Sequence, residues 1–333
     1  MKKYVFRLLG IFLLAMFGTM ACNYIFDSSG VLNTDFSVKR VEPNQHFVKM
    51  RYILSNPEKY NAFCFGSSRI GNIDLNKIDN GLRYYNMTYS EGLPEEWLLD
   101  LQDMVKHGVS IKQVMIGLDD FSIRVDPKQH ENDLLRVPYR DDTLWKTYAL
   151  YLLKKPKLKK EDASRGSVYD IYGSGRPLHP EVDEYIEANV EKHLQDERFS
   201  KPYEYKGNRI AETMESLTKL KELCDDNGIE LIVFVNPVNA VTYRSNDISE
   251  LNAFKYQLAQ LTNYYDFSGL NEITTNNYYY YETSHYRPMV GDMIVDRIFH
   301  NGQRNFGVLV TRDNVKEHLQ KLEEELDIKG SIE

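Results

Sequence analysis

The stretch YNAFCFGSSRI, residues 60–70, decides the fold of this chain. A short apolar run that ends in a turn signal is typical of a strand buried on both faces of a sheet. Gly66 and the two serines that follow it predict a tight turn directly after this strand. Such a turn places side chains at the carboxyl edge of a parallel sheet, where open α/β sheets bind their ligands.

Similar apolar runs recur along the chain, separated by segments with helical spacing. Strands are predicted at residues 60–65, 82–87, 113–118, 229–235 and 263–267, and helices at 94–107, 209–226, 248–261 and 289–299. Short strands that alternate with amphipathic helices, without hairpin signals between them, indicate a parallel sheet covered on both faces. We therefore expect an α/β fold in which a parallel five-stranded sheet forms the centre of a three-layer α/β/α sandwich.

Residues 122–205 break this rhythm, because they are polar and rich in proline. A structureless loop of that length is improbable inside a compact domain, so we interpret the segment as an insertion. Within it, TLWKTYALYLLKKPKLKK, residues 143–160, joins an apolar stretch to a run of lysines. This segment either lies on an anionic membrane surface or forms a partly buried helix with a solvated basic tail. His179 and His193 have no acid at a suitable spacing and are predicted to be surface residues.

The N-terminus carries a candidate membrane anchor. Lys2, Lys3 and Arg7 precede an uncharged, mostly apolar run over residues 8–26. A run of this length spans a hydrocarbon core of about 30 Å at about 1.5 Å per residue, and the basic residues before it favour a cytoplasmic N-terminus. An uncleaved anchor, a lipoprotein signal ending at Cys22 and a cleaved signal peptide remain as alternatives. All three place the rest of the chain outside the cytoplasm.

Composition supports one large folded domain after the anchor. With 333 residues, of which 42% are hydrophobic and 27% charged, the chain can bury a full core. We expect residues 1–27 to form a single-pass anchor in the cell membrane and residues 28–333 to form an extracytoplasmic domain. The net charge of -8 argues against a nucleic-acid partner. The three cysteines lack the spacing of metal sites, so we expect no metal and no cofactor.

Two short motifs carry the candidate chemistry. Ser68 lies in the strand-to-helix turn, where helix N–H groups face a developing oxyanion. Late in the chain, YYETSHYRP, residues 280–288, places Glu282 three positions before His285. A nucleophilic serine needs a base, and the base needs a carboxylate that holds its tautomer. The two motifs therefore predict Ser68 as nucleophile, His285 as base and Glu282 as the orienting acid.

Together with IGLDD, residues 116–120, these motifs resemble the conserved blocks of SGNH (GDSL-like) hydrolases. The blocks are written GDS, a glycine loop, GxND and DxxH, and the motifs of this chain fall in the same order and in approximately the same places. In particular, the motifs resemble those of the membrane-anchored SGNH-like proteins encoded with cell-surface polysaccharide or teichoic acid systems, such as the alginate O-acetyltransferases and the D-alanyl transfer protein. The resemblance spans about residues 45–300 and implies an SGNH/flavodoxin-like fold.

The resemblance also implies roles for further residues. Gly92, with Ser90 as a rival, falls on the glycine loop that supplies a backbone N–H to the oxyanion. Asp119 falls where the family has an oxyanion-hole asparagine. Arg69 either forms an ion pair with Asp119 or Asp120, or anchors an anionic substrate group.

The function implied is that of an acyltransferase or esterase acting on cell-surface glycans at the outer face of the membrane. An acyl donor or glycan is the implied ligand, and a membrane-bound O-acyltransferase is the implied partner. Two departures from the family pattern favour an alternative. An ionised Asp119 repels an oxyanion, and Glu282 is one methylene longer than the family's aspartate. The alternative is a non-catalytic SGNH-like accessory or binding subunit of an envelope polysaccharide assembly.

Overall fold

The computed structural model describes residues 2–34, 43–131, 133–156, 168–300, 302 and 305–330. Its centre is a six-stranded sheet with the order β2-β1-β3-β6-β7-β8. The strands are β1 (Ala62–Phe65), β2 (Tyr84–Asn86), β3 (Gln113–Leu118), β6 (Glu230–Val235), β7 (Tyr264–Asp266) and β8 (Val308–Val310). A separate pair, β4 (Val168–Tyr169) and β5 (Pro177–Leu178), is antiparallel.

The sheet is mixed, which corrects the expectation of a purely parallel sheet with five strands. The pairs from β2 to β7 are parallel, and β8 is antiparallel to β7. β8 is a short edge strand in which Val308 and Leu309 are exposed, at 41% and 39%. Three residues with this burial give no clear strand pattern, and an antiparallel edge strand is common on otherwise parallel sheets.

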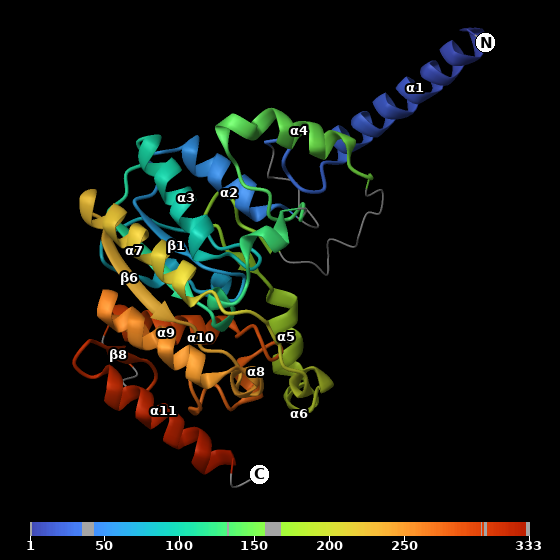
Figure 1. Ribbon diagram of the computed structural model, residues 1–333. Coiled ribbons are helices and arrows are strands. Elements are labelled where there is room, and N and C mark those ends of the chain that lie inside the picture. The colour runs from blue at the N-terminus through green and yellow to red at the C-terminus, as the bar shows by residue number, and fades with distance from the viewer. Residues whose placement is uncertain are drawn as a thin grey trace.

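Helices precede and follow these strands (Figure 1). They are α1 (Lys2–Phe26), α2 (Gln45–Leu54), α3 (Pro94–Lys106), α4 (Leu144–Leu153), α5 (Pro180–Ala188), α6 (Val190–Leu194), α7 (Ile210–Asp226), α8 (Ala240–Ser245), α9 (Ile248–Leu261), α10 (Pro288–Phe299) and α11 (Val315–Gly330). α3 begins at Pro94, whose fixed φ suits the first helical position, and Glu95 and Glu96 lie in its first turn. After α7, Gly228 adopts a φ of 64°, a left-handed conformation that glycine accommodates without strain.

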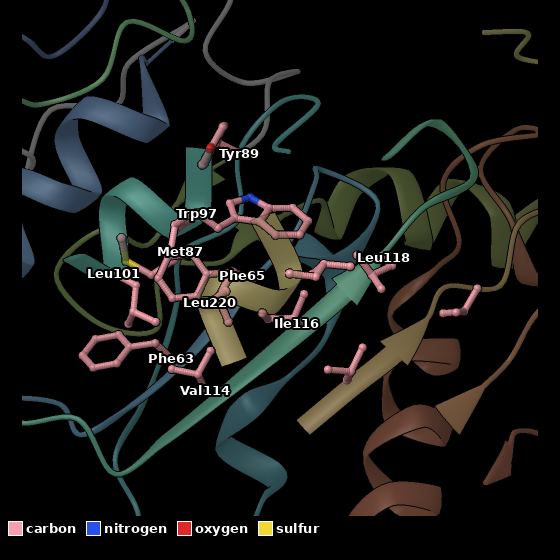
Figure 2. Packing of buried hydrophobic residues seen from close by; sticks show 14 of the residues in the cluster. Phe63, Phe65, Met87, Tyr89, Trp97, Leu101, Val114, Ile116, Leu118 and Leu220 are labelled. Atoms are coloured by element: carbon pink, nitrogen blue, oxygen red, sulfur yellow. The ribbon is translucent and has the colours of Figure 1, made fainter. Parts of the chain in front are cut away.

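Successive strand residues point to opposite faces of the sheet and enter different apolar clusters. Phe63 and Phe65 of β1 belong to a cluster that includes Trp97 of α3 and residues of α7. Figure 2 shows part of this cluster. Ala62 and Cys64, the alternate residues of β1, belong to a second cluster with residues of α10. The sheet is thus buried on both faces, which holds the ends of its strands in fixed positions.

α1 projects away from the rest of the molecule (Figure 1). By length and composition it is able to cross a membrane, with a mean hydropathy of 2.0 over its most apolar window, none of which is buried. Its last turn contacts the domain, where the buried Asn23 donates hydrogen bonds to the carbonyl oxygens of Leu152 and Lys154, at 2.8 and 2.7 Å.

The segment interpreted as an insertion contains α4, the β4-β5 pair, α5 and α6. The apolar part of the segment 143–160 forms α4. Its lysine-rich end, residues 157–160, lies outside the described residues. The division of the chain into an anchor, a domain and an insertion stays a prediction.

Candidate active site

Ser68, His285 and Glu282 form one hydrogen-bonded chain. Ser68 lies in the turn between β1 and a short 3-10 helix (Ile70–Asn72), and His285 lies in the loop before α10. Ser68 Oγ is 2.9 Å from His285 Nε2, and His285 Nδ1 is 2.5 Å from Glu282 Oε1. The structure therefore brings together the three residues that were predicted to act as nucleophile, base and orienting acid.

The loop before α10 fixes both Glu282 and His285. An isolated antiparallel bridge between the buried Tyr280 and Tyr286 closes this loop. The backbone N–H groups of Ser284 and His285 donate to the Glu282 carboxylate, at 2.7 and 2.8 Å. Glu282 thus reaches the imidazole of His285 from three positions earlier in the chain, while the backbone N–H groups of the same loop hold the carboxylate in place.

Glu282 carries a negative charge next to the imidazole. Burial opposes this charge, but the hydrogen bond and electrostatic attraction from His285 and the backbone N–H groups outweigh burial, so the pKa of Glu282 lies below its usual value. A carboxylate at Nδ1 places the proton on that nitrogen, which leaves Nε2 as the acceptor for the Ser68 hydroxyl.

Arg69 is a buried link between the two halves of the site. It is 2% exposed, and its Nε donates to Ser284 Oγ at 2.7 Å. Its Nη1 donates to Asp120 and lies 3.5 Å from Asp119 Oδ1. The guanidinium also packs over the ring of Phe121, 4.9 Å from its centroid. This geometry is that of an ion-pair partner, and so little exposure keeps the guanidinium away from a substrate.

Asp119 lies in the same buried network. Its Oδ1 accepts a hydrogen bond from Asn236 Nδ2 at 2.9 Å. Burial raises the pKa of Asp119, and the Arg69 guanidinium offsets only part of this effect. Asp119 does not line the cavity next to Ser68, because the arginine and the amide hold its carboxylate below the surface.

Gly92 also lies outside the lining of that cavity. Its N–H points to the carbonyl oxygen of Tyr89 at 3.4 Å. A Cβ at this position would lie 2.7 Å from Gly66 O and 2.8 Å from Trp97 Nε1, so close packing requires glycine here. The structure therefore brings neither Gly92 nor Asp119 to the cavity as the oxyanion donor that the resemblance implied.

A cavity of about 330 Å³ opens next to Ser68. This volume lies in the range of small-molecule sites. The core of the domain supplies most of the lining, and residues between 168 and 182 supply one wall. The lining residues are Gln45, Ser68, Asn72, Thr88, Tyr169, Pro177, His179, Val182, Tyr281, Glu282 and His285.

The wall formed by residues between 168 and 182 contains His179, for which the sequence predicted no role in the site. His179 lines the cavity and packs edge-on against the ring of Tyr281, with centroids 5.8 Å apart. Burial lowers the pKa of His179. His193 is buried, and its Nε2 lies 2.8 Å from Tyr280 O. The prediction that His193 is a surface residue was wrong, because contacts with the loop before α10 bury it, whereas His179 is half-buried.

Across the part of the chain that the structure describes, no group of three or more His, Cys, Asp or Glu side chains is arranged to hold a metal ion. No family model matches this chain, and no curated protein matches it significantly. The geometry of the site is therefore the basis for a functional proposal.

Proposed function

We propose that this protein is a membrane-anchored serine acyltransferase or esterase of the SGNH type, acting on cell-surface glycans at the outer face of the membrane. The observation that carries this proposal is the distance of 2.9 Å between Ser68 Oγ and His285 Nε2. The strand order β2-β1-β3-β6-β7 supports it, because these parallel strands match an SGNH/flavodoxin-like three-layer sandwich with the nucleophile after β1.

The reaction has two steps. In the first, His285 Nε2 takes the proton of Ser68 as Oγ bonds to the acyl carbon of the donor. The proton then passes to the leaving oxygen as the donor's C–O bond breaks, which leaves an acyl-serine. In the second step, His285 deprotonates a sugar hydroxyl or a water molecule. That oxygen takes the acyl group, and the proton returns to Ser68. Glu282 stabilises the imidazolium in both steps.

The place of action follows from α1. If α1 anchors the chain with its N-terminus in the cytoplasm, the domain meets glycans at the outer face of the membrane. Tyr169 and Tyr281 line the cavity, and tyrosine rings offer apolar faces on which a sugar ring packs. In this proposal a membrane-bound O-acyltransferase delivers the acyl group.

Labelling by a fluorophosphonate probe tests whether the serine is activated. We expect the folded wild-type chain to be labelled, and Ser68→Ala and His285→Ala to lose the label. Ser67→Ala is the matched control, because Ser67 is the neighbouring serine and lies outside the lining of the cavity. It should keep the label. A folded wild-type chain that takes no label, or labelling that survives in Ser68→Ala, contradicts the proposal.

A second function, that of a non-catalytic binding subunit, is favoured by one observation. Neither Asp119 nor Gly92 lines the cavity, so two positions that supply oxyanion donors in SGNH hydrolases are missing from its wall. In this case the cavity binds a glycan without turnover. The same experiment separates the two functions, because a binding subunit takes no label yet binds glycan fragments in a calorimetric titration.

A further inference from the structure

α4 exposes apolar side chains on its outer face. Thr147 and Tyr151 point inward and are buried. Trp145, Leu150 and Leu153 are exposed, at 69%, 46% and 53%. A surface helix of a soluble domain normally turns polar residues outward. An apolar outer face on a helix with a buried inner face indicates a second contact surface.

The inner face of α4 holds the helix in one orientation. Tyr151 donates a hydrogen bond from its hydroxyl to the carbonyl oxygen of Leu134 and accepts one from Asn44 Nδ2 at 2.8 Å. Asn44 Oδ1 in turn accepts from the N–H of Phe47 and caps α2. The outward direction of Trp145 and Leu153 is therefore set by packing on the domain.

α4 lies beside the end of α1, where α1 meets the rest of the molecule (Figure 1). Asn23, in the last turn of α1, donates to the carbonyl oxygens of Leu152 and Lys154 at the end of α4. Lys154 Nζ also donates to Ser29 Oγ, just after α1, at 2.6 Å. If α1 crosses a bilayer, these contacts place α4 at the surface of that bilayer.

Lysines lie on and just after α4, and Asp141 and Asp142 lie just before it. Lys146 and Lys155 are exposed, although the chain as a whole has a net charge of -8. Lys146 Nζ lies 5.6 Å from the centroid of the Trp145 ring. Tryptophan is enriched at membrane–water interfaces, and lysines near the bilayer surface are attracted to anionic headgroups.

We propose that the outer face of α4, formed by Trp145, Leu150 and Leu153, lies in the headgroup layer of the membrane that α1 enters, and that anionic lipid strengthens this contact. α4 packs on Asn44, and the next residue, Gln45, lines the cavity next to Ser68. Contact of α4 with the bilayer therefore sets the direction in which the cavity faces the membrane.

Trp145 provides its own test. The chain has 2 tryptophans, and the other, Trp97, is fully buried. The full-length chain is placed in nanodiscs of phosphatidylglycerol and phosphatidylcholine, with and without brominated acyl chains that quench tryptophan on contact. Trp145→Phe reports Trp97 alone. The difference in fluorescence between the wild-type chain and Trp145→Phe is the emission of Trp145. We expect brominated lipid to remove most of this emission. Equal emission from brominated and plain nanodiscs overturns the proposal.

Leu153→Glu tests the contact further. It should reduce the quenching of Trp145, because a carboxylate at this position repels the headgroups. Leu99→Glu is the matched control, since Leu99 is a leucine on helix α3 with an exposure of 51%, against 53% for Leu153. It should leave the quenching unchanged. An equal loss of Trp145 quenching in both variants contradicts the contact of α4 with the bilayer. Quenching that is as strong in nanodiscs of pure phosphatidylcholine contradicts the preference for anionic lipid.

Discussion

Glu282→Gln isolates the contribution of the carboxylate to the candidate site. Glu282 accepts three hydrogen bonds, from His285 Nδ1 at 2.5 Å and from the N–H groups of Ser284 and His285 at 2.7 and 2.8 Å. Glutamine keeps nearly the same shape but removes the charge. The NH2 group of glutamine is a donor, and in either orientation of the amide it faces a donor of the protein: the N–H of the imidazole or the backbone N–H groups.

The size of the effect follows from these contacts. A hydrogen bond to a charged group contributes about 1.5–3 kcal/mol, which corresponds to a rate loss of about tenfold to hundredfold. The imidazolium that forms during the reaction also loses its counter-charge, and the equivalent change in a Ser-His-Asp enzyme lowers kcat by about 10⁴-fold. We therefore expect the second-order rate of fluorophosphonate labelling to fall between about 10- and 10⁴-fold.

The rate is measured over a series of probe concentrations, with the unfolding temperature as a control for folding. Glu282→Asp is the matched variant, because it keeps the charge and shortens the side chain by one methylene. It should retain more activity than Glu282→Gln. If Glu282→Gln labels within a few-fold of the wild-type rate while the fold is intact, Glu282 does not orient His285.

Three further predictions concern stability and packing. Asp266→Asn should lower the free energy of unfolding by about 3–5 kcal/mol in urea denaturation, because it leaves the buried Lys255, 3.0 Å away, without its counter-charge. Lys255 and His318 depress the pKa of Asp266 despite its burial, so its stabilisation is complete above the unfolded pKa of about 3.9 and is lost as pH falls toward the lower folded pKa. Acid unfolding that is identical in wild type and Asp266→Asn contradicts this linkage. Gly92→Ala should destabilise the fold by about 1–3 kcal/mol, because the new methyl group meets Gly66 O and Trp97 Nε1, and an unchanged unfolding temperature refutes that packing argument. Arg69→Met should cost about 3–5 kcal/mol by leaving buried Asp119 and Asp120 without a cation, and the loss should shrink in the triple variant that also carries Asp119→Asn and Asp120→Asn.

The central strands were predictable because their apolar runs are bounded by turn residues. The run at residues 113–118 coincides with β3 (Gln113–Leu118), and residues 229–235 contain β6 (Glu230–Val235). β8 was missed because it has three residues and exposes two of them. Local pattern thus identifies strands that are buried on both faces, whereas an edge strand depends on a partner that the pattern does not show.

Some residues of the site were likewise predictable from local sequence, and others were not. The spacing of Glu282 and His285 is local, and the hydrogen bonds of their loop follow from it. The place of His179 in the cavity wall depends on how residues 168–182 fold over the loop before α10, which no local pattern encodes. The sequence left open whether Arg69 pairs with an acid or meets a substrate, and its burial in the structure matches the ion pair.

Arg69 also explains how two residues far apart in the chain keep hydrogen-bonding distance. It directly follows Ser68, and its Nε bonds to Ser284, which directly precedes His285. The turn after β1, which holds Ser68, and the loop before α10, which holds His285, are therefore joined by a hydrogen bond between the sequence neighbours of these two residues. The charge of Arg69 is balanced by Asp120 and Asp119 just after β3, so the end of a second strand fixes the same link. In this arrangement Asp119 serves the geometry of Ser68 and His285, and under the proposed function the oxyanion takes its donors from elsewhere in the site.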